Sequence, residues 1–192
     1  SENEEDNIGK QEHPKILKQF GGKYKNKKLQ NYINSLGNFI VSTSEMPDKK
    51  FTFTILDSPI VNAFALPGGY IYLTRGLISL CQNEAQLAGV IAHEIGHIDN
   101  NHIKQRKQKI NSIENISTIS NLSIIASSVI SQNTELLSGL AFGTANSTES
   151  LIIFSKDQER EADYYSLQTL KKLELYSDSI IELLELIEKR SK

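Results

Sequence analysis

The chain has 192 residues, of which 39% are hydrophobic, so it can bury one substantial core and is too short to build two comfortably. Its formal net charge of -2 leaves no excess of positive charge to neutralise phosphates, which excludes nucleic acid as an expected partner. No run approaches the roughly 20 apolar residues that cross a bilayer, so no transmembrane segment is expected.

The first segment is polar and acidic, and residues 1 to about 13 are predicted to be disordered. The expected organisation is a flexible tail over residues 1–12 and a single domain over residues 13–192. His13 is expected to lie in the tail or on the surface. The single cysteine, Cys81, lies in an apolar run and is expected to pack in the core.

The first predicted helix runs from about Lys27 to Ser42, where apolar residues recur at the spacing of one buried face. Two segments alternate in the manner of strands: residues 51–56 and, after the breaker Pro67-Gly68-Gly69, residues 70–74. The sequence after Arg75 is predicted to be helical. The expected fold class is therefore α+β, predominantly helical, with a small sheet of two or three strands.

The second half of the chain carries further helical signals. Residues 110–150 mix apolar and polar residues at helical spacing, which predicts helices joined by a mobile connection. Ser155 and Gln158 form a capping pair for a helix that fades near Lys172. A last amphipathic helix is predicted at about residues 178–189.

A second capping pair, Asn83 and Gln86, opens a long helix that carries His93-Glu94-Ile95-Gly96-His97. The two imidazoles are four residues apart, so they project from one face and can share a metal ion. Imidazole nitrogen suits zinc, and Glu94 lies close enough to take a proton from a water that the metal activates. The pattern is typical of a metal-assisted peptide hydrolase, with a chance match as the alternative.

A catalytic zinc site needs a third protein ligand and an open fourth position. His102 lies nine residues after His93 and would point away from the metal on a continuing helix. Glu159 and Asp163 lie one turn apart on a later predicted helix, so Glu159 can bind the metal while Asp163 accepts the outer N–H of a zinc histidine. Glu161 is rotated about 200° from Glu159 and cannot face the same ion. Without the histidine motif, this pair would be an ordinary charged helix face.

Four segments in matching order resemble metallopeptidase family forty-eight, and they are residues 57–70, 74–76, 93–97 and 154–163. The family contains the HtpX-type and CAAX prenyl endopeptidases and the BepA-like periplasmic proteases, all gluzincins. The resemblance implies a zincin-type fold, one Zn2+ per chain and these roles: His93, His97 and Glu159 as ligands, Glu94 as general base and Asp163 as supporting neighbour.

The resemblance also implies the function and the location. The chain is expected to be a zinc-dependent endopeptidase that acts on extended protein or peptide chains in quality control of misfolded or misassembled envelope proteins. It looks closest to the soluble periplasmic branch, so a periplasmic or other extracytoplasmic location is expected, and the polar start fits a lipoprotein whose leader is not in this chain. No histidine follows His102, so no later histidine is expected to plug the site.

Strand-forming residues beside the glycine turn can offer a sheet edge to an extended substrate and line the active-site cleft. The candidate substrate-binding residues are Ala63, Phe64, Ala65, Leu66, Gly68 and Gly69. A peptide is expected to pair antiparallel along residues 63–66 or 70–73, with a plain structural hairpin as the alternative. For the oxyanion, three candidates stay open: Tyr164, Tyr165 and Arg160.

A second class of function is a chaperone-like module that holds unfolded chains and keeps a non-catalytic zinc site. Glu94 argues against it, because a structural zinc site needs no general base and is normally closed by four protein ligands.

Overall fold

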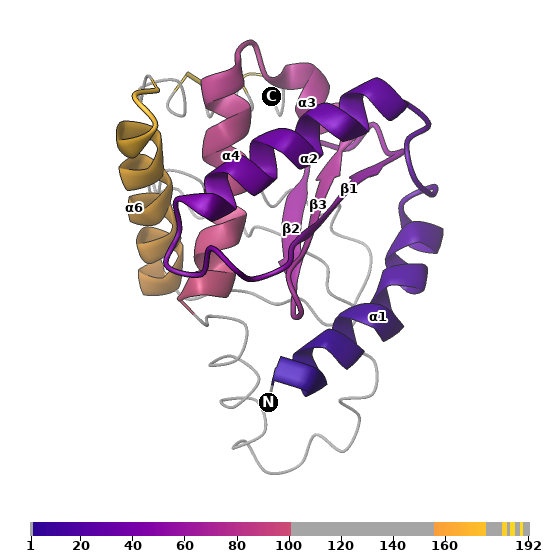
Figure 1. The fold of residues 1–192 in the computed structure, drawn as a ribbon. Helices are drawn as coiled ribbons and strands as arrows, with labels where there is room; N and C mark the ends of the chain where they lie inside the picture. Colours follow the sequence, from indigo (N-terminus) through magenta and orange to yellow (C-terminus); the bar gives the residue numbers. More distant parts are fainter. Residues whose placement is uncertain (1, 101–155, 176–181, 184, 187–188, 190–192) are drawn as a thin grey trace.

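The computed structural model describes residues 2–100, 156–175, 182–183, 185–186 and 189 (Figure 1). The elements within them are α1 (Glu2–Gln19), α2 (Lys27–Ser42), β1 (Thr52–Leu56), β2 (Ala63–Leu66), β3 (Tyr70–Thr74), α3 (Arg75–Leu80), α4 (Glu84–Asp99) and α6 (Lys156–Lys172). The predicted α+β class is confirmed. No helix in this part of the chain is long and apolar enough to cross a membrane.

Several predictions concern residues outside those that the structure describes. They are the predictions for His102, for residues 110–150 and for the capping residue Ser155, and the helix predicted at residues 178–189 is described only in part. The end predicted for the preceding helix, near Lys172, is confirmed.

The three strands form one mixed sheet in the order β1-β3-β2. β3 pairs in parallel with β1, with Tyr70 opposite Thr52, and antiparallel with β2, with Leu73 opposite Ala63. The prediction that residues 70–73 could offer a free edge is therefore wrong, because β3 is hydrogen-bonded on both sides. Sequence periodicity predicted the strands, but the order of strands depends on pairing between distant segments.

One face of the sheet is covered by α1 (Figure 1). Phe64 stacks on Tyr72 with ring centroids 4.9 Å apart, and Phe20, just after α1, lies 5.3 Å from Phe64. His13 Nδ1 is 2.7 Å from the Tyr72 hydroxyl, and Ile16 is fully buried. The predicted disorder is therefore wrong for residues 2–13, and His13 is a partly buried contact with the sheet. Tertiary packing stabilises a helix that its polar composition disfavours.

α2 and α4 pack on the opposite side of the sheet. α2 has the predicted bounds and begins with Asn26, whose side chain accepts a hydrogen bond of 3.0 Å from the backbone of Leu29. Gly37 of α2 lies directly over Phe53, because an added Cβ would fall 2.4 Å from that ring. Cys81 is partly buried against the same core, as predicted, and burial raises its pKa to about 12.

α4 lies between the sheet and α6 (Figure 1). Its predicted cap is confirmed, since the Asn83 side chain accepts a hydrogen bond of 2.9 Å from the backbone of Gln86. Every residue from Ala85 to Ile98 is buried. A helix buried all round cannot rotate or shift without disturbing both neighbours, so it is a rigid platform for side chains.

The start of β2 and the end of β3 are joined by a compact set of hydrogen bonds. The backbone N–H of Asn62 donates to Thr74 Oγ1 over 3.0 Å, and the Thr74 hydroxyl in turn donates to the Ile60 carbonyl. Arg75 Nε and Asp57 Oδ1 are 2.6 Å apart. Two of the segments that carry the family resemblance, residues 57–70 and 74–76, thus meet here and hold β2 in place.

Gly76 is part of this junction, and Gly76→Ala is expected to lower the free energy of unfolding by about 2 kcal/mol. The added Cβ would lie 2.1 Å from the Pro59 carbonyl oxygen, which belongs to the backbone and cannot simply move aside. Urea unfolding followed by circular dichroism measures the change. Ser79→Ala is the control, because Ser79 lies on the same helix, α3, and is exposed. Equal stability of Gly76→Ala and the wild type would contradict the close approach.

Candidate metal centre

Two histidines of α4 and one glutamate of α6 bring their donor atoms to one point. The Nε2 atoms of His93 and His97 are 3.1 Å apart. Glu159 Oε2 lies 3.5 Å from His93 Nε2, and Glu159 Oε1 lies 3.8 Å from His97 Nε2. All three donors thus fall within 4.8 Å of one another, as the ligands of a single ion must.

These distances can be compared with those of a zinc site. Donors at the usual zinc distance of about 2.0–2.1 Å lie about 3.3 Å from one another around a tetrahedral ion. The two imidazole nitrogens are 3.1 Å apart, close to that value, and each has one of the two Glu159 oxygens at 3.5 or 3.8 Å. Two imidazoles and one carboxylate are also a donor set that zinc accepts at catalytic sites. The residues present therefore fit zinc in both spacing and chemistry.

A carboxylate orients the first of the two histidines. His93 Nδ1 is 3.1 Å from Asp163 Oδ1, an ion-pair distance, and within the described residues both atoms are buried without a hydrogen-bond partner. Asp163 is itself buried. In the neutral ring that a metal ion requires, this carboxylate favours a proton on Nδ1, which leaves Nε2, the nitrogen nearer to Glu159 and His97, free to bind an ion.

The electrostatics of the cluster favour a positive charge. Burial by itself lowers the pKa of His93, but the contacts with Asp163 and Glu159 and the charge of Glu94 outweigh burial and raise that pKa to about 10. A site that so strongly favours a cationic ring equally favours a bound cation, and this agrees with the donor geometry.

Glu94 lies beside the ligand cluster on the same buried helix and is only 5% exposed. Burial raises its pKa to about 7, with His93 opposing the shift and Glu159 adding to it. A carboxyl group with this pKa can both accept and release a proton near neutral pH, as a general base and acid must.

The orientation of α6 places Glu159 and Glu161 on different sides of the helix. Its buried residues recur at helical spacing and face α4: Ala162, Asp163, Ser166, Thr169 and Leu170. Glu159 lies on this side and is partly buried, whereas Glu161 is exposed. The structure thus brings together His93, His97, Glu159 and Asp163, which were predicted from the sequence to form the metal centre. Glu161 lies outside this cluster.

Two contacts between α4 and α6 were not predicted from the sequence. The Ser166 hydroxyl donates a hydrogen bond of 2.7 Å to the Gly89 carbonyl in the buried interface. At Gly96, inside the histidine motif, an added Cβ would lie 3.1 Å from Cβ and Cγ of Tyr165. The glycines at positions 89 and 96 were the available signal, because small residues on a helix allow a neighbouring helix to come close.

The candidate substrate-binding residues fall in two places. Residues Ala63–Leu66 form β2, which lies at the sheet edge and contacts α4. Gly68 and Gly69 form the turn between β2 and β3 with φ values of +83° and +81°, and α1 packs against Gly68. The contacts of these two glycines are those of a structural turn, the alternative that the sequence left open.

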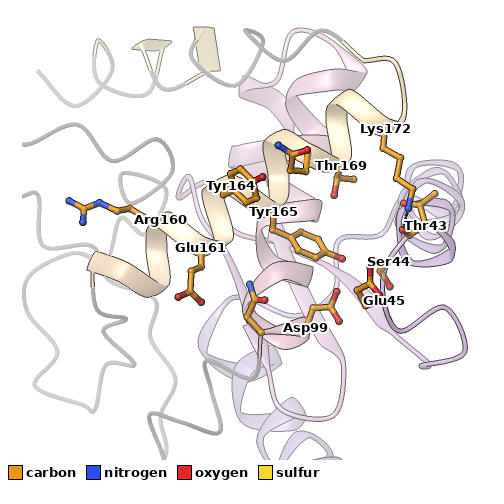
Figure 2. Close-up of a pocket in the computed structure, with 12 residues that line it drawn as sticks. Thr43, Ser44, Glu45, Asp99, Arg160, Glu161, Tyr164, Tyr165, Thr169 and Lys172 are labelled. Atoms are coloured by element: carbon orange, nitrogen blue, oxygen red, sulfur yellow. Dashed lines mark hydrogen bonds between the residues drawn. The ribbon is translucent and has the colours of Figure 1, made fainter.

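A cavity of about 610 Å³ lies at the end of α4, between α6 and residues 43–45 (Figure 2). All three oxyanion candidates line it, but none of the three metal-ligand candidates does. Tyr164 is 65% exposed, and Arg160 forms an ion pair of 3.2 Å with Asp157. Tyr165 packs against Gly96 and so contributes to the contact between the helices.

Comparison with known proteins agrees with this geometry. Residues 26–189 match the profile of peptidase family M48. The chain is 30% identical over 144 residues to the beta-barrel assembly-enhancing protease of Yersinia pestis, covering 75% of this chain and 29% of the relative. It is 32% identical over 146 residues to the protein of that name from Escherichia coli (strain K12), with coverage of 75% and 29%.

A eukaryotic relative matches the same region. The chain is 32% identical over 139 residues to the mitochondrial metalloendopeptidase OMA1 of Schizosaccharomyces pombe, covering 72% of this chain and 38% of the relative. All three relatives are therefore much longer than the region that they share with this chain. The extent of the family match, from before α2 to beyond α6, is nevertheless most of the 192 residues. The chain belongs to peptidase family M48.

Proposed function

We propose that this chain is a zinc-dependent endopeptidase with one zinc ion held by His93, His97 and Glu159. The observation that carries the proposal is the meeting of these three donors, 3.1 to 3.8 Å apart, beside the buried carboxyl group of Glu94. Membership of a peptidase family supports it. A single catalytic domain is part of this proposal, and it includes α1, which packs on the sheet from before the predicted start at residue 13.

Each residue has a defined task in peptide hydrolysis. When bound, zinc supplies a Lewis acid that activates water near neutral pH. Glu94 takes a proton from the attacking water and delivers it to the leaving amine nitrogen. Asp163 holds the His93 ring through Nδ1 and so keeps Nε2 directed at the ion.

The substrates and the location follow from the relatives. Two of them are named beta-barrel assembly-enhancing proteases and one a mitochondrial metalloendopeptidase. By analogy, this chain cleaves misfolded or misassembled proteins of the cell envelope in extended conformation, in the periplasm or another extracytoplasmic compartment.

Cleavage of unfolded casein tests the proposal. The purified chain is expected to cleave casein, to lose this activity after removal of metal with a chelator, and to regain it on addition of zinc. Casein that is bound but not cleaved by the zinc-loaded chain would contradict the proposal and favour the chaperone-like module.

A substrate peptide is expected to pair antiparallel with β2, because a scissile carbonyl must be held in extended conformation next to α4. β2 is the candidate because it lies at the edge of the sheet and contacts the helix that carries His93 and His97. A crystal structure with a substrate-like inhibitor tests this. A peptide bound elsewhere, with the outer edge of β2 paired by the chain itself, would show that the hairpin is purely structural.

A further inference from the structure

The three proposed ligands come from two helices, so the site exists only if α6 holds a fixed position on α4. Glu159 belongs to the first turn of α6, near one end of the contact between the helices. The Ser166 to Gly89 hydrogen bond ties the helices about two turns further along α6. A second contact, made one residue earlier on α6, reaches the turn of α4 that carries the histidines.

Tyr165 provides contacts at that place. Its Cβ, Cγ and Cδ1 atoms lie 3.1 to 3.2 Å from the position that a Cβ would take on Gly96, the residue immediately before His97. Figure 2 shows the Tyr165 ring extending from α6 toward the C-terminal end of α4, where Asp99 lies. The ring thus fills the space between α6 and the turn of α4 that carries His97.

The hydroxyl of Tyr165 continues this contact to two other segments. The hydroxyl points toward Asp99, in the last turn of α4, and Ser44, which follows α2, and the three residues line one cavity (Figure 2). Burial and the Asp99 carboxylate raise the pKa of Tyr165, so the hydroxyl stays protonated and donates to that carboxylate. One side chain therefore connects α6 with the end of α4 and with the segment after α2.

We propose that Tyr165 is a positioning residue, which sets the place of Glu159 in the metal centre by fixing α6 against Gly96 and Asp99. The inference rests on the proposed zinc site and adds a residue that touches neither metal nor substrate. The neighbouring Tyr164 is a tyrosine on the same helix, but its side chain is directed to solvent and is 65% exposed. It therefore provides a matched control.

Zinc competition against a chromophoric chelator, on the full chain, tests the inference. Tyr165→Phe keeps the ring but removes the hydroxyl, and it is expected to raise the zinc dissociation constant about threefold to tenfold, because the hydroxyl acts on Glu159 only through the position of α6. Tyr164→Phe is expected to leave the constant unchanged. Thermal unfolding of the zinc-free variants shows which of them are folded.

Variants at Asp99 test the same contact from its other side. Asp99→Asn retains an acceptor for the hydroxyl and is expected to bind zinc nearly as the wild type does, whereas Asp99→Leu is expected to match Tyr165→Phe. The double variant, Tyr165→Phe with Asp99→Leu, is expected to be no weaker than either single one, because both remove the same contact. Additive losses in the double variant would contradict the shared contact.

Equal zinc affinity of Tyr165→Phe and the wild type, with a lower melting temperature, would show that Tyr165 only stabilises the fold. A wild-type chain that binds zinc but cleaves nothing would instead contradict the proposed function and leave the role of Tyr165 standing. A wild-type chain that binds no zinc would overturn both.

Discussion

Glu94→Gln is expected to lower the rate of peptide hydrolysis by about 10²–10⁴-fold while zinc binding and the fold are kept. The amide has nearly the same shape and can still position a water molecule, but it cannot accept a proton from it. Glu94 is buried beside the ligand cluster, and its pKa of about 7 suits a group that alternates between two protonation states.

Initial rates of casein cleavage at saturating zinc measure this effect. Glu84→Gln is a matched control, because Glu84 begins the same helix but is exposed. The control is expected to cleave at the wild-type rate. Near-wild-type turnover by a zinc-loaded Glu94→Gln variant would show that another group is the base.

Glu159→Ala is expected to lose most of the zinc affinity, because it removes one of three protein donors and leaves only the two imidazoles. Asp163→Ala is expected to weaken zinc binding about 10–100-fold, since it frees the ring of His93 without removing a ligand. Glu161→Ala is expected to bind zinc as the wild type does, because the side chain is exposed and directed away from the cluster.

Equilibrium zinc competition on the three folded variants gives the order of these effects. Glu161→Ala is the matched control for Glu159→Ala, since both remove a glutamate from the same helix within two residues. Loss of zinc by Glu161→Ala, with retention by Glu159→Ala, would mean that α6 is rotated relative to its position here.

The metal centre could be predicted from the sequence because its information is local. His93 and His97 are four positions apart, as are Glu159 and Asp163, and this spacing places the two side chains of each pair on one face of a helix. The sequence signal for a helix start is also local, because Asn83 caps α4 through its own side chain. That α4 and α6 pack together followed only from the chemistry, since a catalytic zinc ion needs a third ligand.

The errors concern contacts between distant segments. α1 is polar enough to resemble a disordered tail, and only the sheet face formed by Phe64 and Tyr72 gives Ile16 and Phe20 a surface on which to pack. The central place of β3 depends on its parallel pairing with β1, which no local pattern encodes. The contact of Tyr165 with Gly96 likewise joins residues 69 positions apart.

A crystal structure of the zinc-loaded chain, with anomalous scattering measured at the zinc absorption edge, tests the central claim most directly. One ion per chain is expected, with His93 Nε2, His97 Nε2 and a Glu159 oxygen at about 2.0–2.2 Å and an open fourth position next to Glu94. A zinc ion closed by four protein ligands, or bound away from His93 and His97, would contradict the assignment of this chain as a metallopeptidase.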